Sequence, residues 1–111
     1  KIGQRNSKLY QKILYSNDRY EINIRGKVDG ITDGYIVESK NRTSRLFNTL
    51  RTYERVQLEG YMFLTGLHKS ILTEHYDDTS NTIHCVHDEL FWNECIKRII
   101  EFVETHIAVN I

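Results

Sequence analysis

The chain has 111 residues, of which 40% are hydrophobic and 27% are charged, and its formal net charge is zero. This length suffices for one packed domain, predicted over residues 1–111, and the composition excludes an intrinsically disordered chain. No apolar run approaches the roughly 18 residues of a membrane-spanning helix, and the first residues are too polar for a secretory signal. With two cysteines, an intracellular protein is expected, and the start at Lys1 suggests a domain taken from a longer chain.

Charge is distributed unevenly along the sequence. Residues 1–69 carry 13 lysines and arginines against 7 acidic residues, whereas residues 70–111 carry 2 against 8. Such an asymmetry permits a basic face that contacts a phosphate backbone, but it is also common on ordinary solvated surfaces. The charge pattern alone therefore does not distinguish a phosphate-binding face from an ordinary solvated surface.

Hydrophobic periodicity predicts the first elements. Leu9, Ile13 and Leu14 lie at helical intervals, which predicts a short helix over residues 5–15. Strict alternation then predicts a half-buried strand over residues 19–28.

A hairpin is expected next. Strands over 27–32 and 35–42 are joined by Asp33 and Gly34, the dipeptide typical of a two-residue type I′ turn. With the strand before them, these strands would form a three-strand antiparallel meander.

The middle of the chain is predicted to be helical. Apolar and amphipathic residues recur in steps of three and four from Leu46 to Leu64, which indicates a helix of about twenty residues. Gly66 fits the left-handed position that ends a helix. The next strand, over 70–76, should lie parallel to the strand over 35–42, because the helix between them forms a right-handed crossover.

The last third is expected to contain a turn over 77–81, a strand over 82–87 and a final helix capped by Asp88. Trp92, near the start of this helix, is expected to pack in the core or against another helix. The elements together predict an α/β fold. Its mixed sheet would combine the meander, the crossover helix and further strands, with helices flanking it.

Three charged residues of the predicted hairpin favour metal chemistry. Glu38 and Lys40 are two apart on a strand, so they project from one face, and Asp29 on the partner strand should lie near Glu38. A carboxylate pair with room for water suits Mg²⁺, and an adjacent lysine could orient or deprotonate an attacking water. An acid and a base two apart are also common on a solvated strand face, so this spacing alone is a weak signal.

Three motifs in register resemble those of the PD-(D/E)xK nuclease superfamily, in its RecB-like and lambda-exonuclease-like branch. They are G-x-x-D at 26–29, a hydrophobic run with E-x-K at 36–40, and Q-x-x-x-Y at 57–61. The resemblance implies a restriction-endonuclease-like core that acts on nucleic acid.

The resemblance also implies residue roles. Asp29, Glu38 and the backbone carbonyl of Ser39 would bind Mg²⁺ or Mn²⁺, and Lys40 would activate the nucleophilic water. RecB-like members place a further Glu on the helix before the first strand, yet residues 1–17 contain no Asp, Glu or His. That ligand either lies before Lys1 or is missing, which puts metal affinity in doubt.

Further residues are expected to support the site or the bound strand. Gln57 and Tyr61, with Tyr53, share one face of the predicted helix, and a Gln there is a poor choice for burial alone. A core helix with one satisfied Gln is the alternative. Four arginines on and before this helix could contact phosphates, although arginine-rich faces are often only solvated: Arg42, Arg45, Arg51 and Arg55.

A zinc site is a weaker alternative elsewhere in the chain. It would use His84, Cys85, His87 and Cys95. His84 and Cys85 are adjacent on a predicted strand and so face opposite ways, and the spacing does not match a zinc finger.

The expected function is a Mg²⁺- or Mn²⁺-dependent nuclease that hydrolyses DNA phosphodiester bonds. An exonuclease acting on single-stranded or duplex DNA ends in replication, repair or recombination fits best, because a chain of this length has little surface for reading base edges. The alternatives are a structure-selective or RNA-directed endonuclease and a non-catalytic nucleic-acid-binding module of the same fold. A homo-oligomer and a part of a larger parent protein both remain open, and no membrane partner is expected.

Overall fold

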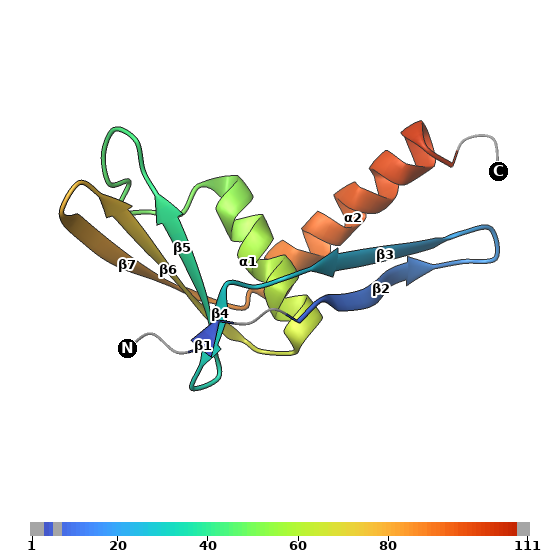
Figure 1. The fold of residues 1–111 in the computed structure, drawn as a ribbon. Helices are drawn as coiled ribbons and strands as arrows, with labels where there is room; N and C mark the ends of the chain where they lie inside the picture. The colour runs from blue at the N-terminus through green and yellow to red at the C-terminus, as the bar shows by residue number, and fades with distance from the viewer. Residues whose placement is uncertain (1–3, 6–7, 109–111) are drawn as a thin grey trace.

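The computed structural model describes residues 4–5 and 8–108. Its elements in chain order are β1 (Gln4–Arg5), β2 (Tyr10–Ser16), β3 (Glu21–Gly26), β4 (Gly30–Thr32), β5 (Tyr35–Asn41), α1 (Thr52–Thr65), β6 (Lys69–Tyr76), β7 (Thr79–Val86) and α2 (Glu89–His106). Five strands form one sheet in the order β1-β4-β5-β6-β7, and β2 and β3 form a separate two-stranded sheet. Because β5 and β6 are parallel and the other pairs antiparallel, this is an α/β fold with a mixed sheet flanked by helices (Figure 1).

The predicted crossover is confirmed. Helix α1 connects β5 to the parallel strand β6, and the register places Glu38 opposite Leu72 and Lys40 opposite Glu74. Strand β6 alternates strictly, so that Ser70, Leu72 and Glu74 are all buried. The hydrophobic core forms where α1 packs on this sheet, from Val28, Ile36, Leu58, Met62, Leu72 and Cys85.

The predicted first helix is wrong, because most of its described part is strand and none of it is helical. Residues 10–16 form β2, which pairs antiparallel with β3. The register shifts between Ile13 and Tyr15, as at a β-bulge, so an extra residue breaks the period-two pattern. The adjacent apolar residues Ile13 and Leu14 then mimic helical spacing, and pairing with a distant strand overrides the local preference. The rest of the predicted helix includes residues 6–7, which lie outside the described residues.

The three-strand meander is also corrected. Strand β3 pairs with β2 and not with β4, while β4 lies between β1 and β5. The β4–β5 half of the meander is confirmed, with Asp33 (φ 49°) and Gly34 (φ 81°) in the left-handed conformations that a type I′ turn requires.

Helix α1 is shorter than predicted. It begins at Thr52 rather than near Leu46, because Asn48 adopts a left-handed φ of 61° and interrupts helical geometry. It ends as expected at Gly66, whose φ is 79°. Segment 42–51 is therefore a loop that joins the end of β5 to the start of α1.

The β6–β7 hairpin turns earlier than predicted, with Asp77 at a φ of 55° and β7 starting at Thr79. The predicted cap of α2 is confirmed, because the Asp88 carboxylate accepts a hydrogen bond of 3.1 Å from the amide of Phe91. None of the helices in the described part of the chain is long and apolar enough to cross a membrane.

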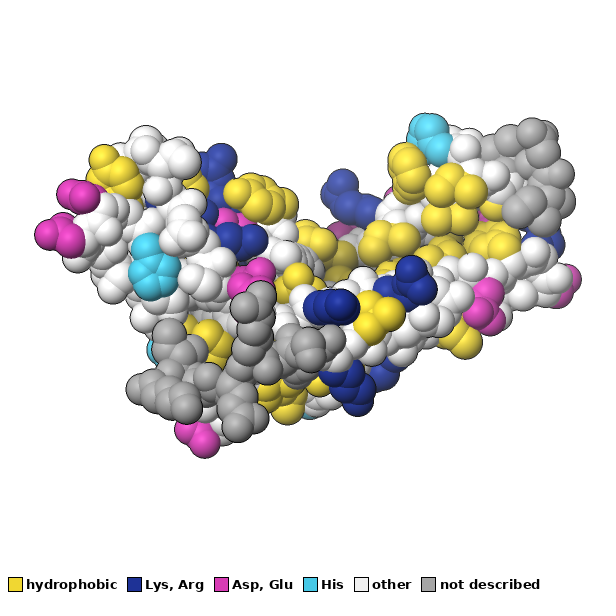
Figure 2. Space-filling view, viewed as in Figure 1, with side chains coloured by type: hydrophobic (Ala, Val, Ile, Leu, Met, Phe, Trp, Pro, Cys, Tyr) yellow, Lys and Arg dark blue, Asp and Glu magenta, His cyan; other side chains and the backbone are white. Residues whose placement is uncertain are grey.

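The β2–β3 hairpin and α2 extend away from the five-stranded sheet on the same side of α1 (Figure 1). The Arg19 guanidinium donates to the carbonyl of Ala108 at 2.8 Å, and the Tyr20 hydroxyl bonds the Glu104 carboxylate, so the hairpin tip is tied to the end of α2. Hydrophobic side chains gather over the region formed by the β2–β3 hairpin and α2 (Figure 2).

Candidate functional site

The central feature of the site is a pair of carboxylates at the hairpin. Asp29 immediately precedes β4, and Glu38 lies on β5. The Asp29 carboxylate accepts a hydrogen bond of 3.2 Å from the amide of Ser39, which ties it to the strand that carries Glu38. The structure therefore brings Asp29, Glu38 and Ser39 together, as the hairpin predicts.

Glu38 is an unusual buried acid. Its exposed fraction is 4%, and its Oε1 atom has no hydrogen-bond partner in the described part of the chain. Burial, and then the negative charge of Asp29, raise the pKa of Glu38 to about 7, although the Lys40 ammonium opposes the shift. A buried carboxylate oxygen without a partner is costly, and the single Lys40 ammonium does not offset burial and the Asp29 charge.

An ion pair and two hydrogen bonds connect this carboxylate to α1. The Lys40 ammonium lies 3.7 Å from Glu38 Oε2 and donates to Gln57 Oε1 at 3.2 Å. The Gln57 amide in turn donates to the Tyr61 hydroxyl at 2.9 Å. Gln57 therefore holds the lysine in place, and its polar side chain on a buried helix face is satisfied by the site.

Tyr61 reaches the site because β3 ends in a glycine. A Cβ atom on Gly26 would lie 3.3 Å from Tyr61 Cε1 and 3.4 Å from a methyl group of Leu64. Burial, and then the charge of Glu38, raise the pKa of the Tyr61 hydroxyl, so it is a neutral hydrogen-bonding group. The glycine of the G-x-x-D motif thus makes room for the tyrosine of the Q-x-x-x-Y motif.

Arg42 lies in a buried ionic network beside the site. Its side chain is 6% exposed and bonds Glu54 at 2.6 Å and Glu74 at 2.9 Å, and both acids are fully buried. Burial would raise the pKa of Glu74, but hydrogen bonds from Phe47, Asn81, Asn48 and Arg42 outweigh it and lower the pKa to about 2. Of the two roles expected for Arg42, phosphate contact and support of the site, this burial leaves only support.

The network shapes loop 42–51. Glu74 accepts the amides of Phe47 and Asn48 at 2.9 and 2.7 Å, and Glu54 accepts the amide of Arg51 at 3.0 Å. These two carboxylates bind backbone donors that a longer α1 would have used within the helix, which explains why the helix starts late.

Two exposed arginines are stacked on one ring of this loop. The guanidinium carbons of Arg45 and Arg51 lie 4.9 and 4.8 Å from the centre of the Phe47 ring, and buried Arg42 lies at 4.2 Å. Stacking preorganises an arginine without consuming its donors. Basic side chains are visible near the start of α1 (Figure 2).

Arg55 points elsewhere. Its guanidinium bonds Asp88 at 2.7 Å and lies 4.0 Å from the centre of the Phe91 ring, so it faces α2. The structure thus groups Lys40, Gln57 and Tyr61 at one site but separates Arg55 from them.

The four residues of the zinc alternative do not converge. Among residues 4–5 and 8–108, no group of three or more His, Cys, Asp and Glu residues is placed to hold a metal ion. His87 instead bonds the buried Glu59 carboxylate at 2.7 Å.

Sequence reasoning missed the buried acids Glu54, Glu59 and Glu74. The signal for Glu74 was present, because it follows Ser70 and Leu72 in a period-two pattern and so had to share their buried face. Its partner Arg42 was assigned to the surface because nothing local shows that an arginine is enclosed.

Comparison with known proteins informs the fold alone. No family model matches the sequence, and no curated protein matches it at a significant level. The crystal structure of SSO0001 resembles this chain with a TM-score of 0.69 at 18% sequence identity. The likeness covers 90% of this chain and 50% of that chain, so this chain spans half the length of SSO0001. It supports the α/β fold with a mixed sheet.

Proposed function

We propose that this chain is a metal-dependent nuclease that hydrolyses DNA phosphodiester bonds on a restriction-endonuclease-like core, as an exonuclease acting on DNA ends. One observation carries the proposal. Glu38 is a buried carboxylate with an unpartnered oxygen and a raised pKa, and a second carboxylate, Asp29, lies beside it. The motif resemblance supports the same assignment.

The residues present fit a divalent cation. Asp29 and Glu38 repel each other, and a hard cation would relieve that repulsion and satisfy the unpartnered oxygen. The two carboxylates and the Ser39 carbonyl would hold Mg²⁺ or Mn²⁺. Such an ion, when bound, supplies Lewis-acid stabilisation of phosphate charge and lowers the pKa of a coordinated water.

Lys40 would position the water. Its ammonium is fixed between Glu38 and Gln57, so a donor that remains can orient the oxygen that attacks phosphorus. The water oxygen then forms a new P–O bond and releases a proton to solvent, the bond to the leaving oxygen breaks, and that oxygen takes up a proton. Arg45 and Arg51 would hold neighbouring phosphates through their guanidinium forks.

The direct test is digestion of end-labelled single-stranded and duplex DNA with Mg²⁺ or Mn²⁺. We expect degradation from the labelled ends by the wild-type chain, and losses of at least about a hundredfold in Asp29→Asn and Lys40→Ala, because each removes a positioned group. Asp33→Asn and Lys97→Ala are matched controls, because both residues are exposed and lie outside the site.

The label also decides between cleavage modes. Shortening from an end establishes an exonuclease, whereas fragments from circular DNA, or cleavage of RNA only, would contradict that part of the proposal. Equal activity of the Asp29→Asn and wild-type chains would contradict the assignment of the site.

One observation favours a second candidate, a non-catalytic nucleic-acid-binding module. The described residues supply two carboxylates at the site, and no acid occurs in residues 1–17. DNA binding by the protein, with no cleavage in the presence of either Mg²⁺ or Mn²⁺, would establish this candidate. Binding should then fall in Arg51→Ala and weaken steeply with salt.

A further inference from the structure

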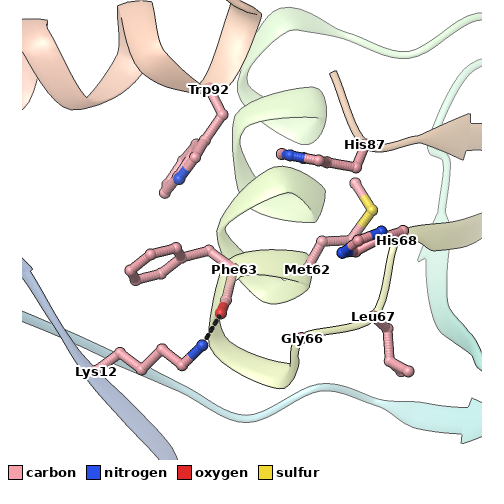
Figure 3. A pocket seen from close by; sticks show the side chains of 8 residues that line it. All are labelled: Lys12, Met62, Phe63, Gly66, Leu67, His68, His87 and Trp92. Carbon is pink, nitrogen blue, oxygen red and sulfur yellow. Dashed lines mark hydrogen bonds between the residues drawn. The ribbon is translucent and has the colours of Figure 1, made fainter. Parts of the chain in front are cut away.

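A cavity of about 200 Å³ lies beside the C-terminal half of α1, away from the carboxylate site (Figure 3). Its wall comes from β2, from the end of α1 and the segment after it, from the link between β7 and α2, and from the start of α2. None of the residues assigned above to the nuclease site lines it. Because ligand pockets for drug-sized molecules span roughly 300–1,000 Å³, this cavity suits a smaller, ring-sized group.

Aromatic rings form much of the wall. Phe63 and Trp92 have ring centres 5.6 Å apart, and His68 and His87 have ring centres 5.5 Å apart. Figure 3 shows the Trp92 and His87 rings directed into the same space above Met62 and Phe63. Flat apolar faces of this kind favour a planar aromatic ligand.

A buried donor in this wall lacks a partner. Trp92 is 6% exposed, and its Nε1–H group has no hydrogen-bond acceptor in the described part of the chain. Buried indole N–H groups normally find a partner, and an unsatisfied one costs free energy. The Nε1 atom itself has almost no exposed surface, so an acceptor on a ligand reaches it when the Trp92 ring turns toward the cavity.

Two further contacts add charge and rigidity. The His87 ring is anchored by the fully buried Glu59, which also accepts the amide of Asp88 at 2.7 Å. The Lys12 ammonium donates to the Phe63 carbonyl at 3.0 Å and lies 5.1 Å from the centre of the Phe63 ring (Figure 3). An ammonium has three donors, so Lys12 can also bind an anion at the exposed side of the cavity.

We propose that this cavity binds one nucleotide unit, with its base against the aromatic wall and its phosphate at Lys12. When the Trp92 ring turns toward the cavity, its N–H group donates to a ring nitrogen or carbonyl of the base. A nucleobase combines a flat face, in-plane acceptors and an attached anion, and the wall offers a partner for each. The proposal is independent of nuclease activity, because no residue of the carboxylate site takes part.

Trp92 is the only tryptophan in the chain, so its fluorescence reports on this cavity directly. The experiment titrates dAMP, deoxyribose 5-phosphate and a short single-stranded oligonucleotide into the protein in EDTA, with excitation of the indole. Phe63→Leu and Lys12→Met are the test variants. Phe102→Leu and Lys27→Met, at exposed positions away from the cavity, are the matched controls.

We expect saturable quenching by dAMP and none by deoxyribose 5-phosphate, with about tenfold weaker binding in each test variant and none of that loss in the controls. Quenching by the oligonucleotide but not by dAMP would identify the nucleotide unit as part of a strand, and the reverse would identify a free nucleotide. Absence of saturable quenching by either, or equal quenching by deoxyribose 5-phosphate, would overturn the proposal. Quenching in EDTA that survives in Lys40→Ala separates this result from that of the nuclease test.

Discussion

Two groups of buried carboxylates lie on neighbouring strands and differ in how they are satisfied. Glu74 on β6 accepts hydrogen bonds from two backbone amides and from the side chains of Asn81 and Arg42. These bonds lower its pKa to about 2. Glu38 on β5 keeps an unpartnered oxygen beside a second acid, and its pKa is raised to about 7. Two buried glutamates thus have opposite pKa shifts, because their hydrogen-bond partners and neighbouring charges differ. A buried acid whose hydrogen bonds are all satisfied, here called the saturated acid, stabilises the fold. One with an unpartnered oxygen, here called the unsaturated acid, carries an electrostatic cost that a cation can relieve.

Removing Arg42, the cation that pairs with Glu54 and Glu74, should have the largest effect on stability. Arg42→Met leaves the fully buried Glu54 and Glu74 without their arginine, so we expect the free energy of unfolding to fall by about 3–5 kcal/mol. Urea denaturation measures this loss. Arg98→Met is the matched control, because Arg98 pairs with Glu94 on an exposed helix face at 3.3 Å and such pairs contribute about 0.3–0.5 kcal/mol. Similar losses in both variants would refute the distinction.

Neutralising the unsaturated acid should have the opposite sign. The pKa of Glu38 is higher in the folded state than in the unfolded chain, so its contribution to stability is present below about pH 4.5 and lost as the pH rises through 7. We therefore expect Glu38→Gln to be more stable than the wild-type chain by about 3 kcal/mol at pH 8 without metal. The advantage should disappear near pH 4.5. Denaturation at both pH values tests this, and a variant less stable at pH 8 would contradict it.

Glu74 determines how stability changes at acidic pH. The pKa of Glu74 is depressed, so its contribution is present above about pH 4.5 and lost as the pH falls through 2. Metal-free stability should therefore fall in both directions from about pH 4.5 as far as these two acids control it.

A divalent cation should sharpen the contrast between the two groups. Mn²⁺ at a hundred times its dissociation constant would stabilise the wild-type chain by about 2.7 kcal/mol. The gain should be larger at pH 8 than at pH 5.5, because metal binding requires the deprotonated Glu38 carboxylate. Thermal denaturation with and without Mn²⁺ measures it, with Asp29→Asn expected to lose the gain and Asp33→Asn expected to keep it. An equal gain in Asp29→Asn would place the ion elsewhere.

The smallest effect is expected at Lys40. Its ammonium lies 3.7 Å from Glu38 Oε2 and lowers the pKa of Glu38. Burial and the charge of Asp29 have larger effects in the opposite direction. Lys40→Met should therefore raise that pKa further and change stability at pH 8 by no more than about 1 kcal/mol. A carbon-13 NMR titration of the Glu38 carboxyl measures the shift, and a lower pKa in the variant would contradict the described geometry.

The two groups also differ in how far the sequence predicted them. The carboxylate site was predictable because Asp29, Glu38 and Lys40 lie within twelve consecutive residues of one hairpin, whose turn dipeptide sets the register. The network of Arg42, Glu54 and Glu74 was not, since its members come from three elements and only packing shows that they are enclosed.

What the sequence determined by itself is local: the type I′ turn at Asp33 and Gly34, the end of α1 at Gly66, and the cap at Asp88. Each depends on the backbone preference or side-chain reach of one or two residues. Tertiary structure decided that residues 10–16 are a strand and that residues 46–51 are not helical. Both outcomes depend on distant partners, β3 in one case and the buried acids in the other, whose hydrogen bonds outweigh local propensities of a few tenths of a kcal/mol per residue.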